Sequence, residues 1–185
     1  MCGNWIRCFS KFVYDNGLVD DKIFTVETLA GIKTIWLETD EKNEVKSVKV
    51  NMGYPIFEPN KIPVDINKEK VVLESINVDG KEIEFSSVLV GVPHTVIFVD
   101  DMNFIEVVDR KNINIYTWER GAGRTLGCGT GSCASVVIGN VLSKLDDSVH
   151  VKTEGGNLEV QLKENYEIFM KGSATTICNG EFLNI

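Results

Sequence analysis

Short runs of β-branched and aromatic residues, separated by turn residues, occupy most of this 185-residue chain. Such runs are typical of β-strands, because these side chains pack well on a pleated, half-buried surface. We predict strands at 23–28, 34–38, 45–52, 71–78, 82–90, 94–99, 104–108, 113–118, 149–153, 158–162 and 167–171. Asp79-Gly80 predicts a tight hairpin, since both turn positions need positive φ. Antiparallel sheet therefore dominates the expected fold.

Only two segments show the spacing of an amphipathic helix. Ile6, Phe9 and Val13 fall on one face of the first segment. We predict Asn4 as its N-cap and Asn16-Gly17 as its end. We expect this helix to be buried, with strands wrapped around it.

The second helix is predicted to start at Thr130, a good N-cap residue. Apolar residues then recur at positions 134, 137, 138, 141, 142 and 145. This spacing predicts a second buried helix.

Each predicted helix is entered through Cys-Gly followed by a capping residue. The two sequences are Cys2-Gly3-Asn4 and Cys128-Gly129-Thr130. This weak internal repeat predicts an α+β fold of two pseudo-symmetric units, each a mostly antiparallel sheet wrapped around a central helix. We place the units at residues 1–88 and 89–185.

Composition and charge exclude several classes of protein. The chain is 43% hydrophobic and 25% charged, which is ordinary for a globular protein. Its formal net charge of -8 argues against a nucleic-acid partner, since phosphate backbones are bound by Lys and Arg. No apolar run approaches the roughly 20 residues of a membrane helix, and no signal peptide is recognisable. We therefore expect a cytoplasmic protein without a membrane partner.

The two Cys-Gly turns suggest acid–base chemistry. A helix N-terminus stabilises an anion, and a cysteine placed there can have its pKa lowered from about 8.5 toward neutrality. If the two helix starts face one another, Cys2 and Cys128 can act on opposite faces of one carbon atom. A substrate carboxylate would then be held by the turn amides of Gly3, Asn4, Gly129 and Thr130.

The cysteines also allow plainer interpretations. Five cysteines without an export signal indicate reduced thiols, and a cysteine near a helix start is often a small core residue. We assign Cys8, Cys133 and Cys178 mainly to the core. A zinc site built from Cys2, Cys8, Cys128 and Cys133 is disfavoured, because the spacings differ from the usual Cys-x-x-Cys pairs.

Two motifs resemble those of diaminopimelate epimerases. Met1-Cys2-Gly3-Asn4 with Arg7-Cys8 resembles the first cysteine motif of that family, and residues 118–123 leading into Cys128-Gly129-Thr130-Gly131 resemble the second. The similarity continues over Pro93-His94, residues 106–110 and the Gly155-Gly156 hairpin. The resemblance implies interconversion of LL- and meso-2,6-diaminopimelate, in lysine and cell-wall precursor synthesis, without pyridoxal phosphate or a metal.

Carried over by motif, the resemblance assigns roles to further residues. Cys2 and Cys128 become the two acid–base thiols. Glu119 would hold the reacting ammonium group, and Arg120 would pair with the distal carboxylate through its planar fork. His94 matches a histidine beside the site. Without the motif, Glu119, Arg120 and His94 would be interpreted as ordinary surface or core residues.

The chain also departs from the family pattern. Family members carry a segment before the first cysteine motif, and a longer insert before the position for which Asn103 is the stand-in. We therefore expect an incomplete first unit that leaves Ile6, Phe9 and Val13 exposed, and a poor or inactive epimerase. Val92 stands where many relatives have a substrate-binding Asn. Trp5 replaces a small residue and is expected to crowd the ligand.

Three alternatives stay open from the sequence. One is a proline or hydroxyproline racemase of the same thiol-pair superfamily, for which Arg120 is the discriminating residue, because a second carboxylate needs a cation. Another is a non-catalytic fragment that keeps only the core. The third concerns assembly, since the sequence allows either a monomer or a homodimer.

Overall fold

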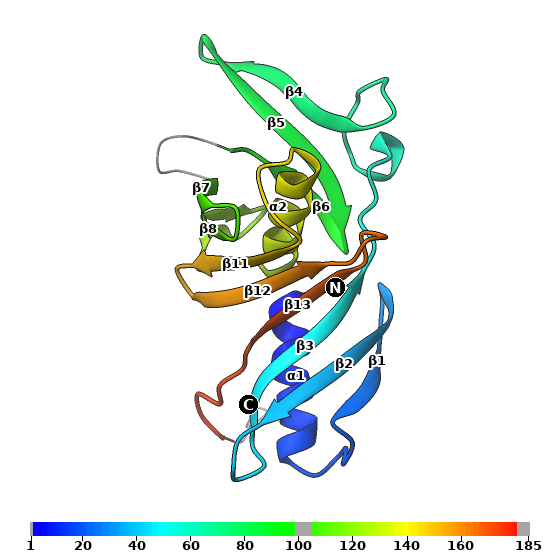
Figure 1. Cartoon of the computed structure of the whole chain (residues 1–185), viewed down its shortest axis with the longest axis vertical. Coiled ribbons are helices and arrows are strands. Elements are labelled where there is room, and N and C mark those ends of the chain that lie inside the picture. Colours follow the sequence, from blue (N-terminus) through cyan, green and yellow to red (C-terminus); the bar gives the residue numbers. More distant parts are fainter. Residues whose placement is uncertain (1, 99–104, 181–185) are drawn as a thin grey trace, which may run out of the picture.

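The computed structural model describes residues 2–98 and 105–180, in which one long sheet runs past two helices (Figure 1). The helices are α1 (Gly3–Asp15) and α2 (Gly129–Val141), with a short 3-10 helix, η1, at Pro59–Lys61. The strands are β1 (Ile23–Thr28), β2 (Gly31–Thr39), β3 (Val45–Gly53), β4 (Val71–Val78), β5 (Lys81–Val90), β6 (Val92–Val96), β7 (Ile105–Asp109), β8 (Asn112–Ile115), β9 (Thr117–Glu119), β10 (Gly123–Thr125), β11 (Ser148–Thr153), β12 (Gly156–Leu162) and β13 (Ile168–Ser173).

The long sheet joins the beginning of the chain to its end. Its strand order is β1-β2-β3-β13-β12-β11-β8-β7. All neighbours are antiparallel except β8 and β11, which run parallel. The junction lies between β3 and β13, where Val50 is paired with Met170. The predicted α+β class with mostly antiparallel sheet is confirmed.

The alternation of side chains along β3 places α1 on one face of the sheet. Val48, Val50 and Met52 are buried, whereas the residues between them are half-exposed. Because successive side chains of a strand point to opposite faces, this period of two defines one apolar face. The helix packs against that face of β3 and β2 (Figure 1).

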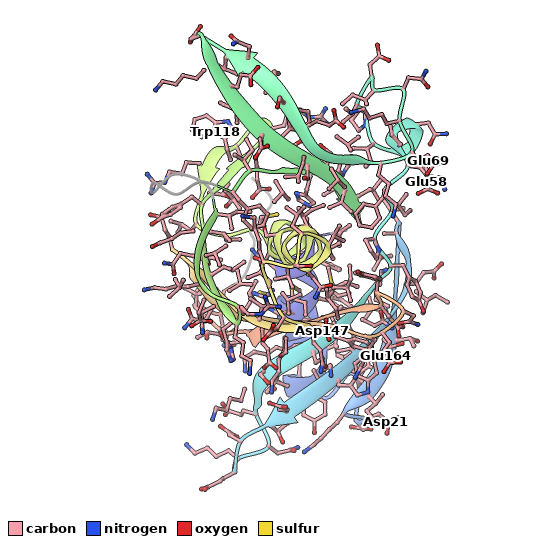
Figure 2. The ribbon with its side chains drawn as sticks, turned by 45° about the horizontal axis from the view of Figure 1, so that its top comes forward. Asp21, Glu58, Glu69, Trp118, Asp147 and Glu164 are labelled. Carbon is pink, nitrogen blue, oxygen red and sulfur yellow. The ribbon has the colours of Figure 1, made fainter. Side chains whose placement is uncertain are left out.

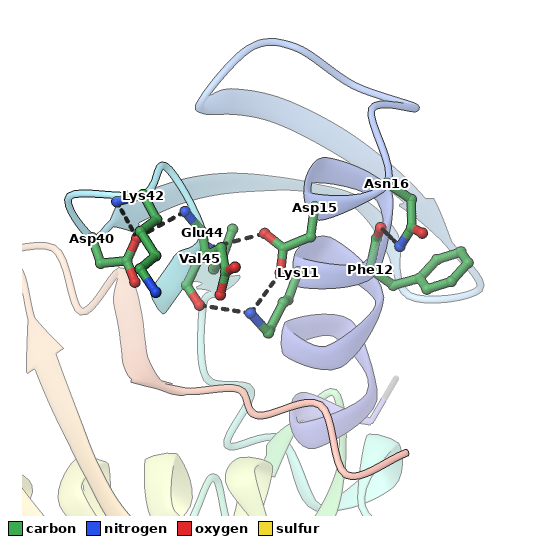
Figure 3. Close-up of polar contacts among 8 residues, drawn as sticks. All are labelled: Lys11, Phe12, Asp15, Asn16, Asp40, Lys42, Glu44 and Val45. Atoms are coloured by element: carbon green, nitrogen blue, oxygen red, sulfur yellow. Dashed lines mark hydrogen bonds and ion pairs between the residues drawn. The ribbon is translucent and has the colours of Figure 1, made fainter. Parts of the chain in front are cut away.

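Polar contacts fix the last turn of α1 to the start of β3 (Figure 3). Lys11 forms an ion pair with Asp15 and donates a hydrogen bond of 3.0 Å to the carbonyl of Val45. The Asp15 carboxylate accepts from the N–H of Val45 at 2.9 Å. The carboxylate of Asp40 accepts from two backbone N–H groups of the β2–β3 turn. These bonds satisfy the free backbone groups at the strand start.

The face of α1 that we expected to be exposed is the face that contacts the sheet. Ile6 is 0% exposed and Val13 is 7% exposed, and Phe9 is partly buried. The prediction that these three residues lie in water is therefore wrong, because β2 and β3 cover them. The exposed apolar side chains of α1 are instead Trp5, at 54%, and Phe12, at 58%.

Helix α2 is buried on almost every side, by β5 and β6 on one flank and by β12 and β13 on the other. Its buried hydroxyl groups are satisfied within the helix. Ser132 donates to the carbonyl of Cys128 at 2.9 Å, and Ser135 donates to that of Gly131 at 2.9 Å. Such bonds to the carbonyl four residues earlier let small polar residues sit in an apolar core.

The hairpin predicted at Asp79-Gly80 is confirmed. Both residues have positive φ, of 50° and 83°, and they connect β4 to β5. Strand β5 crosses the predicted unit boundary at residues 88 and 89 while it packs on α2. The division of the chain into units 1–88 and 89–185 therefore stays a prediction.

Acidic side chains lie over the surface of the whole molecule. Exposed examples run from Asp21 in the lower part to Glu58 in the upper part, with Asp147 and Glu164 between them (Figure 2). Exposed carboxylates are thus present in both halves of the molecule. Within the described residues, no helix has the length and apolar character needed to cross a membrane.

Candidate active site

The two helices begin directly after cysteines. Cys2 is the N-cap of α1 and Cys128 is the N-cap of α2, both with extended backbone. Their carbonyl groups accept the first helical hydrogen bonds, at 3.2 Å and 2.9 Å. The predicted caps Asn4 and Thr130 are wrong, since both residues lie inside the first turn. Each helix therefore starts two residues earlier than the polar capping residues suggest.

The two Cys-Gly turns touch one another. A Cβ atom built on Gly3 would lie 3.3 Å from the Cα of Gly129, and one built on Gly129 would lie 3.2 Å from the Cα of Gly3. The side chain of Met170 on β13 lies beneath both. The absence of side chains at these two positions is what allows the helix starts to meet face to face.

The side chain of Asn4 bridges the two turns. Its Nδ2 donates a 3.0 Å hydrogen bond to the carbonyl of Gly127, the residue before Cys128. Its Oδ1 accepts from Arg7 at 3.2 Å. From the sequence, Asn4 was predicted only as a helix cap and a turn amide and Arg7 was given no role, although both stand in the first cysteine motif.

A cavity of about 720 Å³ opens where the turns meet. Its lining includes every predicted site residue except Asn103, which lies outside the described residues. The lining residues are Cys2, Gly3, Asn4, Pro63, Val92, Pro93, His94, Trp118, Glu119, Arg120, Gly127, Cys128, Gly129 and Thr130. Residues from the beginning and the middle of the chain are thus brought to one site.

The sulfur of Cys128 is held at the start of α2. It accepts from the N–H of Gly131 at 3.4 Å and lies 3.4 Å from the hydroxyl of Thr130. These contacts aim the thiol at the helix N-terminus, where the macrodipole favours negative charge. Cys2 occupies the equivalent place on α1 but is exposed and has no side-chain capping bond.

The carboxylate of Glu119 is fixed by a short hairpin. Strands β9 and β10 place Thr125 beside it, and the Thr125 hydroxyl donates to Glu119 at 2.7 Å. Arg120 follows in the turn and is exposed where it lines the cavity. Trp118, just before, also lines the cavity and is 75% exposed. The hairpin thus presents an anion and a cation side by side.

The imidazole of His94 lies between two cavities. It lines the main one and a second of about 250 Å³, which shares Cys128, Glu119 and Trp118 with the first. Its Nε2 is buried and has no hydrogen-bond partner among the described residues. Burial lowers the pKa of His94 to about 4, and the nearby Glu119 carboxylate opposes this shift. The ring is therefore neutral at pH 7.

The remaining three cysteines are either buried or exposed. Cys133 is fully buried in α2, and this burial raises the pKa of its thiol far above the ordinary value. Cys8 and Cys178 are exposed, so their predicted assignment to the core is wrong. In the part of the chain described, no cluster of three or more His, Cys, Asp or Glu side chains is arranged to hold a metal ion.

Val92 and Trp5, two departures from the family pattern, lie in different environments. Val92 lines the main cavity beside Pro93. Trp5 does not line it, and stacks instead on Phe9, with ring centroids 4.9 Å apart. The expectation that Trp5 crowds a ligand is therefore wrong, because the helix directs its indole away from the cavity.

Several known proteins that are similar in sequence to this chain are diaminopimelate epimerases. A family model described as diaminopimelate epimerase matches residues 1–58 and 100–177. The diaminopimelate epimerase of Alkaliphilus metalliredigens (strain QYMF) is 41% identical over 208 residues, covering 100% of this chain and 73% of the relative. That of Methanothermobacter thermautotrophicus is 41% identical over 210 residues, covering 99% and 73%. That of Clostridium perfringens is 40% identical, covering 99% and 74%.

Solved structures share the fold at much lower identity. A Bacillus anthracis phenazine biosynthesis protein of the PhzF family superposes with a TM-score of 0.62 at 16% identity, covering 94% of this chain and 73% of that one. A PhzF-family protein of Enterococcus faecalis gives a TM-score of 0.59 at 13% identity, covering 99% and 74%. These similarities show the fold alone.

Proposed function

The chain belongs to the diaminopimelate epimerase family, and we propose that it interconverts LL- and meso-2,6-diaminopimelate by proton transfer between two thiols. The reaction is an isomerisation in lysine biosynthesis and cell-wall precursor synthesis. The observation that carries the mechanism is the meeting of two cysteine-capped helix starts in one cavity, beside Glu119 and Arg120.

Cys2 and Cys128 are proposed as the acid–base pair. One thiolate removes the α-proton from one face of the substrate carbon, while the other thiol delivers its proton to the opposite face. The C–H bond that breaks is replaced by a new C–H bond with inverted configuration, and the proton balance is zero. The pair ends each turnover with its protonation states exchanged, ready for the reverse reaction.

The carboxylate of the reacting centre is proposed to bind at the first turns of both helices. Helix N-termini leave backbone N–H groups without intrahelical partners, and these groups stabilise the charge that develops as the α-proton leaves. The amides concerned are those of Gly3, Asn4, Gly129 and Thr130. Thiols and amides supply the chemistry in this proposal, without pyridoxal phosphate.

The two charged residues of the β9–β10 turn are proposed to select the substrate. Glu119, held by Thr125, pairs with the ammonium group of the reacting centre. Arg120 pairs with the distal carboxylate, which a monocarboxylic substrate such as proline lacks. The neutral His94 is proposed to line the site beside Cys128, and Asn103 is kept as a substrate contact on the resemblance alone.

A reducing compartment suits this mechanism, because both thiols must stay unlinked to exchange protons. We therefore propose a cytoplasmic enzyme that acts on a small molecule. Whether it works as a monomer or a homodimer is decided by light scattering of the active protein.

Solvent exchange tests the proposal. In D₂O, LL-diaminopimelate should yield meso product with deuterium at one inverted α-carbon, because that proton comes from an enzyme thiol equilibrated with solvent. Cys2→Ala and Cys128→Ala should each abolish the reaction, whereas Cys178→Ala, which alters an exposed cysteine outside the cavity, should leave it unchanged. Proton exchange on L-proline but not on diaminopimelate would favour the racemase alternative. No exchange on either substrate would indicate a non-catalytic fragment.

A further inference from the structure

Arg7 is the one cation that contacts the first Cys-Gly turn within the described residues. Its Nη1 donates to the carbonyl of Gly3 at 3.2 Å and to Oδ1 of Asn4 at 3.2 Å. Its Nε donates to the carbonyl of Ser173 on β13 at 3.3 Å. One planar guanidinium group therefore connects the start of α1 to the last strand of the sheet.

The guanidinium lies close to the backbone of β13. A Cβ atom built on Gly172 would lie 3.1 Å from Nε of Arg7, so this close approach depends on the absence of a side chain at that position. Burial lowers the pKa of Arg7, and the thiols of Cys8, Cys133 and Cys2 oppose the shift. A partly buried cation is costly unless its donors are satisfied, which favours the bonded geometry.

Arg7 also decides which way the Asn4 amide points. An arginine offers only donors, so the oxygen of the amide must face it. The amide nitrogen is then left to donate to the carbonyl of Gly127, next to Cys128. In the flipped orientation, the NH₂ group would face the guanidinium donors and the amide oxygen would face a carbonyl oxygen. Arg7 thereby specifies the bridge between the two Cys-Gly turns.

We propose that Arg7 is a positioning residue, which sets the separation of the Cys2 and Cys128 thiols through Asn4 and the anchor on β13. It touches neither substrate nor reacting atoms. Its effect on turnover rests on the proposed function, whereas its effect on thiol spacing does not. A misplacement of about 1 Å in a proton-transfer geometry can cost about a hundredfold in rate.

Thiol spacing is measured without substrate. In a background carrying Cys8→Ser and Cys178→Ser, the equilibrium between the dithiol and the Cys2–Cys128 disulfide in glutathione buffers gives the effective concentration of one thiol at the other. Cys133 is buried and does not compete. The variants are Arg7→Met, Arg7→Lys and Asn4→Asp. Arg110→Met is the matched control, because that arginine also bonds a side chain and a carbonyl but does not line the cavity.

The three variants test the two contacts through which Arg7 is proposed to act, its anchor on β13 and its bond to Asn4. Arg7→Met should lower the effective concentration at least tenfold, and Arg7→Lys should fall between it and the unsubstituted chain, because one ammonium cannot keep the same fork. Asn4→Asp keeps an acceptor for Arg7 but loses the donor to Gly127, so it should lose thiol pairing as Arg7→Met does. Adding Arg7→Met to Asn4→Asp should change little further, since both act through one bridge.

Kinetics on LL-diaminopimelate supply the second readout. We expect kcat to fall tenfold to a hundredfold in Arg7→Met, with KM changed less than threefold, because the distal contact at Arg120 is untouched. Far-UV circular dichroism and the thermal midpoint identify any unfolded variant. If Arg7→Met unfolds, Arg7→Lys and Asn4→Asp carry the test.

The outcomes distinguish this inference from the proposed function. If the unsubstituted chain does not exchange α-protons but thiol pairing falls in the variants, the proposed function fails and the positioning role stands. If folded Arg7 variants keep the thiol pairing of the Arg110→Met control, the positioning role is overturned, whatever the chain does to diaminopimelate.

Discussion

Gly3 and Gly129 lie in backbone contact across the two helix starts, so that a methyl group on either would press on the Cα of the other at 3.2–3.3 Å. The two residues are 126 positions apart in the sequence. Their contact brings the caps Cys2 and Cys128 to one cavity. Substitution of these glycines therefore tests the arrangement of the site more directly than substitution of the thiols.

Gly129→Ala is expected to reduce activity without unfolding the chain. Alanine in a helix is favoured over glycine by about 0.5–1 kcal/mol, which offsets part of the crowding against Gly3 and the Met170 sulfur. The thermal midpoint should therefore change by only a few degrees, while kcat falls about tenfold to a hundredfold. Gly180→Ala is the control, because nothing lies within 4 Å of its added methyl group. Full activity in Gly129→Ala would show that the turns need not touch.

Alkylation should separate the five cysteines into three groups. At pH 7, iodoacetamide should modify Cys2 and Cys128 fastest, and substrate should protect both. Cys8 and Cys178 are exposed but lie outside the cavity lining, so substrate should not protect them, which makes them internal controls. Cys133 should react only after unfolding, because it is buried. Faster labelling of Cys8 or Cys133 than of both cap cysteines would refute the assignment.

Mild oxidation should link Cys2 to Cys128 and stop turnover, with recovery on reduction. A disulfide needs Cα atoms about 4.4–6.8 Å apart. Cys2 and Cys8 cannot meet this requirement while α1 is intact, because six residues of helix rise about 9 Å. Peptide mapping of the oxidised protein identifies the pair. A Cys2–Cys8 link in folded protein would contradict the facing-turn geometry.

Acidification should destabilise the fold through His94. Its pKa is about 4 in the folded state against 6.5 in the unfolded chain, so the unfolded chain takes up the proton first as the pH falls. Stability from this group is complete above pH 6.5 and decreases between pH 6.5 and 4, by up to about 3 kcal/mol. Urea unfolding at pH 7 and pH 5 measures the loss. His94→Gln should remove this part of the pH dependence, and His150→Gln, on an exposed β11 position, should retain it.

Local pattern was enough for most elements of the fold. The predicted bounds of β1 and β4 agree with the structure. In both, turn residues at each end of a run of β-branched residues mark where the strand begins and ends. The run at 113–118 is divided in the structure into β8 and β9, which belong to different sheets. Strand β10 was missed, since the three residues Gly123–Thr125 have no apolar alternation and are paired only through β9.

The site was predictable in its residue types but not in its contacts. The motifs located the residues that line the cavity, whereas the bridge from Asn4 to Gly127 joins positions 123 residues apart and leaves no local signal. The exposure of Cys8 was missed for a related reason. Helical spacing defines the apolar face of α1, and Cys8 lies off that face, but its residue type suggested the core.

Because β3 pairs with β13, the long sheet cannot be completed until the end of the chain has been synthesised. Strand β3 leaves the ribosome more than a hundred residues before the strand that completes its hydrogen bonding. At about 5–20 residues per second, its edge waits on the order of ten seconds without a partner. An unpaired apolar strand edge is a template for pairing with another chain. The nascent N-terminal hairpins are therefore the segment for which chaperone protection during translation matters most.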